Sequence, residues 1–283
     1  MILEYLSPKT PTEALRCLNQ WKGKAALIAG GTNVIADLRG NSLKPQVLID
    51  LSHIKALSYV KQERQKVRIG GLTTLADLVS SAVIREQAPV LYEAARRIGN
   101  PLVRNRATLA GNLADASPAA DTAVPLLVLD AGILVERQKG KAKTIPIDRF
   151  FTGPNRTVLK RDELIREIQF PKPAISAKMA YFKFGLRNAM AVSVVSVAVL
   201  VEMETGTVKR VRIGLGAVAP TPIRAYGIEE MLTGQQITDE LIERCGERVI
   251  EEICTIADIR ASLEYRKSLT SVILKRLLEQ VSK

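Results

Sequence analysis

Two short segments carry residue types that could bind a small anionic ligand. The first, residues 28–33, reads Ile-Ala-Gly-Gly-Thr-Asn and directly follows an apolar run that is typical of a strand. Its two glycines allow backbone N–H groups to turn outward and approach an anion closely. Thr32 adds a hydroxyl, and the helix expected next would present its positive end. The segment fits a diphosphate, although a tight turn after a strand would explain the same glycines without any ligand.

The second segment, residues 104–121, gathers hydroxyl, amide and small side chains ahead of an apolar helix. Gly111 allows close approach, and Thr108, Asn112 and Ser117 could donate hydrogen bonds to phosphate or ribityl oxygens. Asp121 could accept from hydroxyl groups, and its alternative role is the N-cap of the next helix. The first segment is neither a Gly-x-Gly-x-x-Gly fingerprint nor a Walker loop, so the common nucleotide motifs are absent.

The elements that must position the first segment alternate between strand and helix. The expected elements are a helix over residues 10–21, a strand over 25–29, a short helix over 32–39 and a strand over 47–50. Thr10 and Pro11 suit the start of the first helix. This alternation predicts a small α/β unit in the first ~55 residues.

From residue 57 onward the pattern changes. A hairpin is expected over residues 59–69 and helices over 74–80, 89–98 and 121–129. Strands are expected over residues 133–135, 144–147 and 165–170. Pro171-Lys172-Pro173 is the expected linker. Strands over residues 180–187, 192–203 and 208–217 follow, the last two joined by a hairpin turn. The remainder is expected to be helical, with apolar residues at a spacing of three to four over residues 263–281.

Composition limits the classes of partner. The chain has 283 residues, enough for about two domains. It carries 41 Lys plus Arg and 29 Asp plus Glu, so its formal net charge of +12 favours an anionic partner. Only 4% of its residues are aromatic and the basic residues are scattered, so we expect no nucleic-acid binding. The longest nearly apolar run, residues 189–201, is too short to span a membrane.

Cysteine and histidine usage excludes several kinds of site. Cys17, Cys245 and Cys254 are far apart and odd in number, and no Cys-x-x-Cys occurs. We therefore expect no disulfide framework, no iron–sulfur cluster or structural zinc in this chain, and a cytoplasmic location. His53 is the only histidine, which excludes multi-histidine metal sites. We also find no paired carboxylates or triad, and we assign no catalytic residue.

Taken together, the segments resemble the FAD-binding subunit, or FAD domain, of the molybdenum hydroxylases. This is the xanthine dehydrogenase and carbon monoxide dehydrogenase medium-chain family, within the vanillyl-alcohol-oxidase-like flavin fold. The resemblance covers almost the whole chain in the family's order and spacing. It rests on residues 29–32, 104–105, 108–112, 116–118, 121, 163–171 and 262–266.

The resemblance implies an α+β fold with two domains. Residues 1–173 would form an FAD-binding domain of the vanillyl-alcohol-oxidase (PCMH) type, with a small α/β subdomain over 1–55 and a larger α+β subdomain over 56–173. Residues 174–283 would form a C-terminal α+β domain with a three-stranded antiparallel sheet and helices.

The same resemblance implies where FAD binds. Both segments would hold the diphosphate, Ile165 would lie against the isoalloxazine ring, Lys183, with Tyr181 near it, would approach that ring, and Ile98 would lie near the adenine. The expected FAD contacts are Ala29, Gly30, Gly31, Thr32, Asn33, Val34, Thr108, Ala110, Gly111, Asn112, Ser117, Asp121, Ile165 and Lys183. His53 lies outside both segments and is expected at the surface, so we expect non-covalent FAD.

The implied function is electron transfer within a multi-subunit enzyme. Electrons would pass from iron–sulfur clusters on a small subunit through FAD to NAD, a quinone or oxygen, while a large molybdopterin subunit hydroxylates the substrate. Relatives often carry acidic residues after the position of Arg187, where this chain has Asn188-Ala189-Met190, so NAD use is open. The alternatives are a free-standing FAD oxidoreductase similar to the enolpyruvyl-glucosamine reductases, and a basic binding module without flavin.

Overall fold

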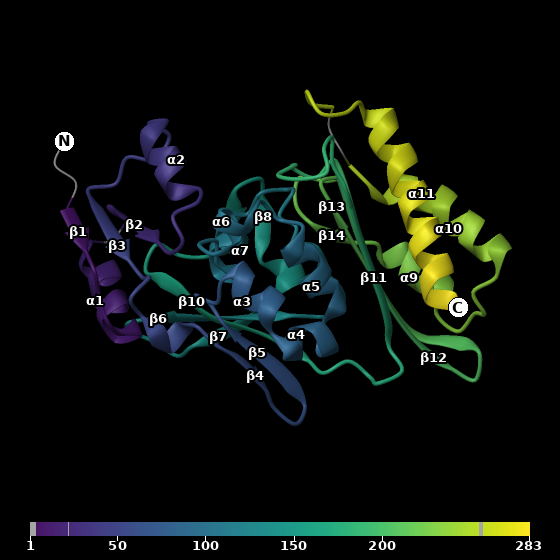
Figure 1. Cartoon of the computed structure of the whole chain (residues 1–283), viewed down its shortest axis with the longest axis horizontal. Helices are drawn as coiled ribbons and strands as arrows, with labels where there is room; N and C mark the ends of the chain where they lie inside the picture. Colours follow the sequence, from purple (N-terminus) through teal and green to yellow (C-terminus); the bar gives the residue numbers. More distant parts are fainter. Residues whose placement is uncertain (1–3, 22, 255–256) are drawn as a thin grey trace.

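Three sheets lie in a row along the long axis of the molecule (Figure 1). The structure is a computed structural model that describes residues 4–21, 23–254 and 257–283. The first sheet is parallel, with the strand order β1-β3-β2, and helix α1 packs against it. Its elements are β1 (Glu4–Leu6), α1 (Pro11–Trp21), β2 (Ala25–Ile28), α2 (Val34–Arg39) and β3 (Val47–Asp50). The expected α/β unit is therefore present, with β1 as an edge strand that the sequence pattern did not reveal.

The second sheet is antiparallel, with the strand order β4-β5-β10-β6-β7. Its strands are β4 (Val60–Gln62), β5 (Lys66–Gly70), β6 (Gly132–Arg137), β7 (Lys143–Pro146) and β10 (Glu163–Pro171). Alternate residues such as Val67, Ile133 and Ile168 enter one core, while Arg68 and Gln169 lie on the other face. This period of two is typical of an antiparallel sheet with one buried face. The expected linker begins inside β10, which runs through Pro171.

Six helices cover the buried face of the second sheet. They are α3 (Leu75–Ser80), α4 (Ala82–Gln87), α5 (Pro89–Arg96), α6 (Pro101–Arg104), α7 (Leu109–Asp115) and α8 (Ala123–Val128). The single turns η1 (Lys55–Leu57) and η2 (Ile147–Arg149) and the small hairpin β8 (Phe151–Gly153) with β9 (Arg156–Thr157) complete this part. Helices α4, α6 and α7 were not predicted, whereas α3 and α8, which are equally short, were.

The third sheet separates two cores. Its strands are β11 (Lys178–Phe184), β12 (Val195–Glu204), β13 (Thr207–Gly216) and β14 (Ile223–Arg224). In β12, Ala198 and Leu200 belong to the core shared with the second sheet, whereas Val197 and Val199 belong to the C-terminal core. Helices α5 and α8 lie on one side of this sheet. On the other side lie α9 (Tyr226–Leu232), α10 (Asp239–Glu252) and α11 (Leu263–Ser282). Burial on both faces explains the nearly continuous apolar run of β12.

The expectation of a three-stranded sheet in this part of the chain was wrong. The order is β11-β12-β13-β14, and β14 adds a fourth strand by pairing Gly214 with Arg224 and Leu215 with Ile223. Two residues are too few for any alternation to be visible in a sequence. No helix in the described part of the chain is both long and apolar enough to cross a membrane.

An ion-pair cluster joins the end of α8 to the third sheet. Asp130 lies 2.7 Å from Arg210, 3.0 Å from Arg212 and 2.8 Å from Arg224. Burial alone raises the pKa of Asp130, but hydrogen bonds from Arg210 and Arg212 and the charges of Arg212 and Arg224 together hold that pKa below its ordinary value. A carboxyl group with a lowered pKa in the folded state stabilises the fold above its unfolded pKa of ~3.9.

We predict that Asp130→Asn lowers the free energy of unfolding at pH 7 by about 1–3 kcal/mol, because three arginines lose their shared anion. The difference between the two proteins should shrink as the pH falls from about 4 through the lowered pKa of the folded-state carboxyl, because a proton then binds Asp130 first in the unfolded chain and finally in the folded one as well. Urea denaturation from pH 7 to pH 3 measures it. Asp162→Asn removes a charge that forms no ion pair in the described chain and serves as the control. Equal losses for both variants would contradict the prediction.

Candidate functional site

The first glycine segment is in direct contact with the second. It follows β2 and continues into α2. A Cβ atom on Gly30 would lie 1.8 Å from the carbonyl oxygen of Arg106, so no other residue fits there without moving a backbone. Gly31 has a φ of +76°, a conformation that L side chains rarely adopt. Both glycines are therefore required by geometry, and the contact brings together residues 76 positions apart.

The first segment offers backbone donors. The N–H groups of Gly31, Thr32 and Asn33 have no acceptor anywhere in the described chain. Successive unpaired N–H groups form a concave site that favours an anion. Because α2 has only six residues, we attribute this preference to the amides themselves rather than to a helix dipole.

In the second segment the backbone amides of residues 109–112 already have acceptors within the protein. The Thr108 side chain caps α7 by accepting from the N–H of Gly111 at 3.1 Å. The N–H groups of Leu109 and Ala110 donate to the carbonyls of Thr73 and Gly71. Residues 109–112 therefore offer a side-chain donor rather than backbone donors. The Oδ1 atom of Asn112 accepts from the hydroxyl of Thr122 at 2.5 Å, which leaves the Asn112 Nδ2 group as a donor.

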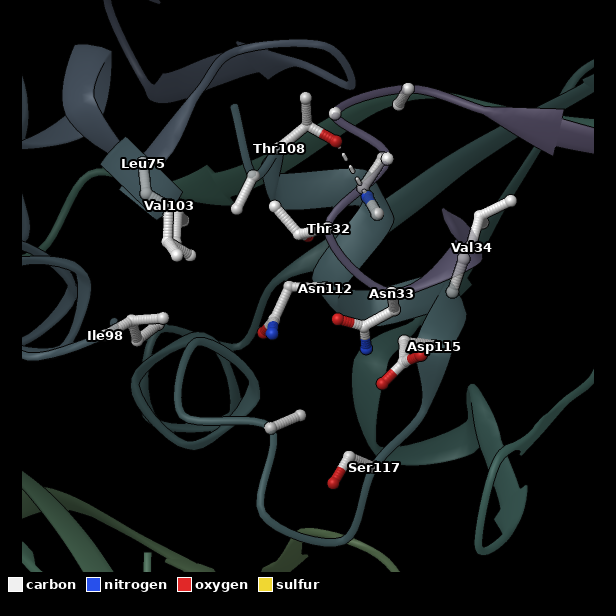
Figure 2. A pocket seen from close by; sticks show the side chains of 18 of the residues that line it. Thr32, Asn33, Val34, Leu75, Ile98, Val103, Thr108, Asn112, Asp115 and Ser117 are labelled. Atoms are coloured by element: carbon white, nitrogen blue, oxygen red, sulfur yellow. Dashed lines mark hydrogen bonds between the residues drawn. The ribbon is translucent and has the colours of Figure 1, made fainter. Parts of the chain in front are cut away.

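One cavity of about 690 Å³ is lined by residues of both segments. In Figure 2 the side chains of Asn33 and Asn112 extend into the same open space, with Ile98 and Ser117 at its margins. The cavity is lined by every residue expected at the site: Ala29, Gly30, Gly31, Thr32, Asn33, Val34, Thr108, Ala110, Gly111, Asn112, Ser117, Asp121, Ile165 and Lys183. Ile98 also lines it, whereas Tyr181 lies behind Asp121.

Sequence reasoning missed the apolar walls of the cavity. Lining residues that it did not single out include Leu27, Leu51, Leu72, Leu75, Val103, Leu159, Leu164 and residues 190–192. These aliphatic residues cannot be told from ordinary core residues in a sequence. Their contribution becomes visible only once the segments are brought together.

Asp121 and Lys183 form a buried ion pair at the cavity wall. Their side chains are each 7% exposed, and Lys183 Nζ lies 2.6 Å from the carboxylate. The hydroxyl of Ser193 also donates to Asp121, and that of Tyr181 donates at 3.4 Å. Burial, followed by the charge of Asp121, raises the pKa of Tyr181 well above its ordinary value, so this phenol stays protonated.

Asp121 does not cap the following helix, as one of its two expected roles would require. Helix α8 begins at Ala123, and Thr122 occupies the N-cap position without a side-chain bond to the backbone. The carboxylate instead accepts from three side chains, which occupy most of its lone-pair directions. Asp121 therefore fixes the position of Lys183, the one cationic side chain that lines the cavity within the described residues.

Ile165 reaches the cavity from the second sheet. Strand β10 carries a bulge between Ile165 and Glu167, where its pairing with β6 shifts by one residue. A bulge changes the direction of the side chains beside it. Gly71 keeps the neighbouring backbone close, since a Cβ there would lie 2.6 Å from the carbonyl oxygen of Ile165.

His53 and the cysteines lie away from this site. His53 is exposed, with Nε2 3.9 Å from the Asp50 carboxylate, and it is not among the lining residues. Cys17 is half-buried, Cys245 is buried and Cys254 is exposed, and none of them lines the cavity.

Comparison with known proteins points to one family. Residues 1–173 match the family described as "FAD binding domain in molybdopterin dehydrogenase", and residues 180–281 match "CO dehydrogenase flavoprotein C-terminal domain". The chain is 33% identical to the carbon monoxide dehydrogenase medium chain of Hydrogenophaga pseudoflava over 97% of this chain and 95% of that one. It is 30% identical to the xanthine dehydrogenase FAD-binding subunit of Escherichia coli O157:H7, over 91% and 88%.

A solved structure supports the same assignment. It is carbon monoxide dehydrogenase from Hydrogenophaga pseudoflava lacking the Mo-pyranopterin moiety of the molybdenum cofactor. This chain is similar to it with a TM-score of 0.94 and 32% sequence identity, over 99% of this chain and 98% of that one. The resemblance expected from the glycine segments is confirmed: the chain belongs to the FAD-binding medium subunits of the molybdenum hydroxylases.

Proposed function

We propose that the cavity holds one non-covalently bound FAD, whose diphosphate accepts hydrogen bonds from Gly31, Thr32 and Asn33. The observation that carries this proposal is the set of unpaired N–H groups facing Asn112 across one cavity. The cavity volume lies in the range of cofactor sites, which are mostly apolar with a few placed polar groups. No histidine or cysteine of the described chain lines it, so a non-covalent mode fits the residues present.

The chain's own residues have distinct parts in this proposal. Ile165 supplies an apolar surface for the ring, and the Asp121–Lys183 pair supplies a fixed polar edge from which a Lys183 N–H can donate. Ile98 supplies an apolar surface for the adenine. FAD supplies redox chemistry with one-electron and two-electron steps when it is bound. The protein binds and orients it and excludes water from most of its surface.

The division of the chain in this proposal follows the expected boundaries. An FAD domain of the PCMH type over residues 1–173 would consist of subdomains 1–55 and 56–173, followed by a C-terminal domain over 174–283. The three clusters of buried apolar residues support this division, because they centre on the first sheet, the second sheet with its helices, and the C-terminal helices.

We further propose that the chain transfers electrons within a multi-subunit enzyme. An iron–sulfur small subunit would deliver electrons to this subunit, a molybdopterin large subunit would hydroxylate the substrate, and NAD, a quinone or oxygen would be the final acceptor. The names of the relatives, which are medium chains and FAD subunits of dehydrogenases, support such an assembly. A cytoplasmic location agrees with three cysteines that form no disulfide.

We predict that Asn112→Ala weakens FAD binding about tenfold, because one side-chain donor to a charged acceptor is lost. Fluorescence titration of the flavin-free full chain with FAD measures the dissociation constant. Asn19→Ala is the matched control, because Asn19 is a half-buried residue of α1 that does not line the cavity. Thermal unfolding without FAD reports separately on the lost Thr122 contact. An unchanged dissociation constant for Asn112→Ala would show that Asn112 donates no hydrogen bond to FAD.

A second prediction concerns the assembly. Tagged chain purified from its native cells should be yellow and should bring down two further subunits, one with iron–sulfur clusters and one with molybdenum. Visible absorption, metal analysis and mass spectrometry check this. A yellow chain that alone oxidises NADPH with a substrate would favour a free-standing flavoenzyme, and a colourless chain without partners would contradict the proposed function altogether.

A further inference from the structure

Arg104 and Arg106 lie directly behind the cavity wall without facing the cavity. Neither is among the lining residues. Arg106 instead borders a second hollow of about 420 Å³, which shares Gly30 with the cavity and is also lined by Lys55 and Asn105. Both guanidinium groups nevertheless reach the backbone of segments that do line the cavity.

Each arginine donates to the carbonyl that precedes a glycine of positive φ. Arg106 Nε lies 3.4 Å from the carbonyl oxygen of Gly30, just before Gly31. Arg104 Nη1 lies 3.2 Å from the carbonyl oxygen of Ile98, just before Gly99, and 3.5 Å from that of Gly99 itself. The φ angles of Gly31 and Gly99 are +76° and +55°.

The direction of the N–H groups follows from peptide geometry. In a trans peptide the C=O of one residue and the N–H of the next point in opposite directions, and all described peptides here are trans. When an arginine outside the cavity holds the carbonyl, the N–H of the following glycine turns to the opposite side. Gly31 and Gly99 both line the cavity, and neither N–H has an acceptor among the residues described.

We propose that Arg104 and Arg106 are positioning residues that hold the Gly30–Gly31 and Ile98–Gly99 peptides so that both glycine N–H groups donate into the cavity. The inference rests on the proposed function, since FAD is the acceptor it assumes. It assigns the arginines a role through the backbone and no contact with the cofactor. Without them, each glycine peptide could rotate, since glycine adopts both signs of φ readily.

Three substitutions of Arg106 separate this role from a simple charge effect. Arg106→Gln keeps an N–H donor at the position of Nε and removes the charge. Arg106→Met has a side chain as long as that of glutamine but carries neither the donor nor the charge. Arg106→Lys keeps the charge and loses the Nε donor. We measure the dissociation constant of FAD for the flavin-free full chain by fluorescence. Arg64→Met, in the exposed turn between β4 and β5, controls for net charge.

We expect Arg106→Met to raise the dissociation constant about tenfold and Arg106→Gln to stay within about twofold of the unchanged chain. Arg106→Gln should bind at least as tightly as Arg106→Lys. For Arg104, whose donor is the terminal Nη1, Lys should retain most of the affinity and Met should lose about tenfold. The losses should persist at about 0.5 M salt, where charge effects between exposed groups are screened.

Several results would overturn the inference. One is equal weakening by Arg106→Gln and Arg106→Met with recovery in Arg106→Lys, which indicates a charge effect. Another is unchanged binding by both methionine variants. If circular dichroism shows that Arg106→Met fails to fold, the test is whether Arg106→Gln or Arg106→Lys has the lower dissociation constant for FAD. Tighter binding by Arg106→Lys would contradict the inference. An unchanged chain that does not bind FAD would instead refute the proposed function, and so the two failures are distinguishable.

Discussion

The close contact between Gly30 and the carbonyl of Arg106 is the constraint on which the rest of the site depends. The first segment belongs to a small parallel sheet, and the second belongs to the helical layer on a separate antiparallel sheet. A cavity between them requires that two independently formed pieces of backbone approach within van der Waals distance. Only a residue without a side chain permits this, because a Cβ on Gly30 would lie 1.8 Å from the carbonyl oxygen.

The two segments then contribute different kinds of donor. Residues 31–33 leave their backbone N–H groups unpaired, whereas the amides of residues 109–111 are used within their own neighbourhood and leave the Asn112 side chain to donate. Lys183, the one cation that lines the cavity in the described part of the chain, is held by Asp121. The charge of a bound diphosphate would therefore be met mainly by oriented dipoles, which need no reorganisation on binding. The arginines of the second segment are placed to orient dipoles rather than to neutralise the ligand.

Local sequence signals predicted part of this arrangement. The glycine segments, the long helix α11 and the paired strands β12 and β13 were all visible, because each is set by nearby residues and a clear period. Strand β14 was not visible, because two residues are too few to show an alternation, and helix α7 was not predicted either. The role of Asp121 could not be chosen from the sequence, because its partners Lys183 and Ser193 come from the third sheet. The apolar lining was equally hidden among core residues.

A structure of the full chain with FAD bound would show whether the backbone of the first segment holds the diphosphate. We expect diphosphate oxygens within about 3.2 Å of the backbone nitrogens of Gly31, Thr32 and Asn33, with Ile165 against the ring. A diphosphate that lies outside the cavity, or one held chiefly by lysine and arginine side chains with those three nitrogens facing elsewhere, would contradict it.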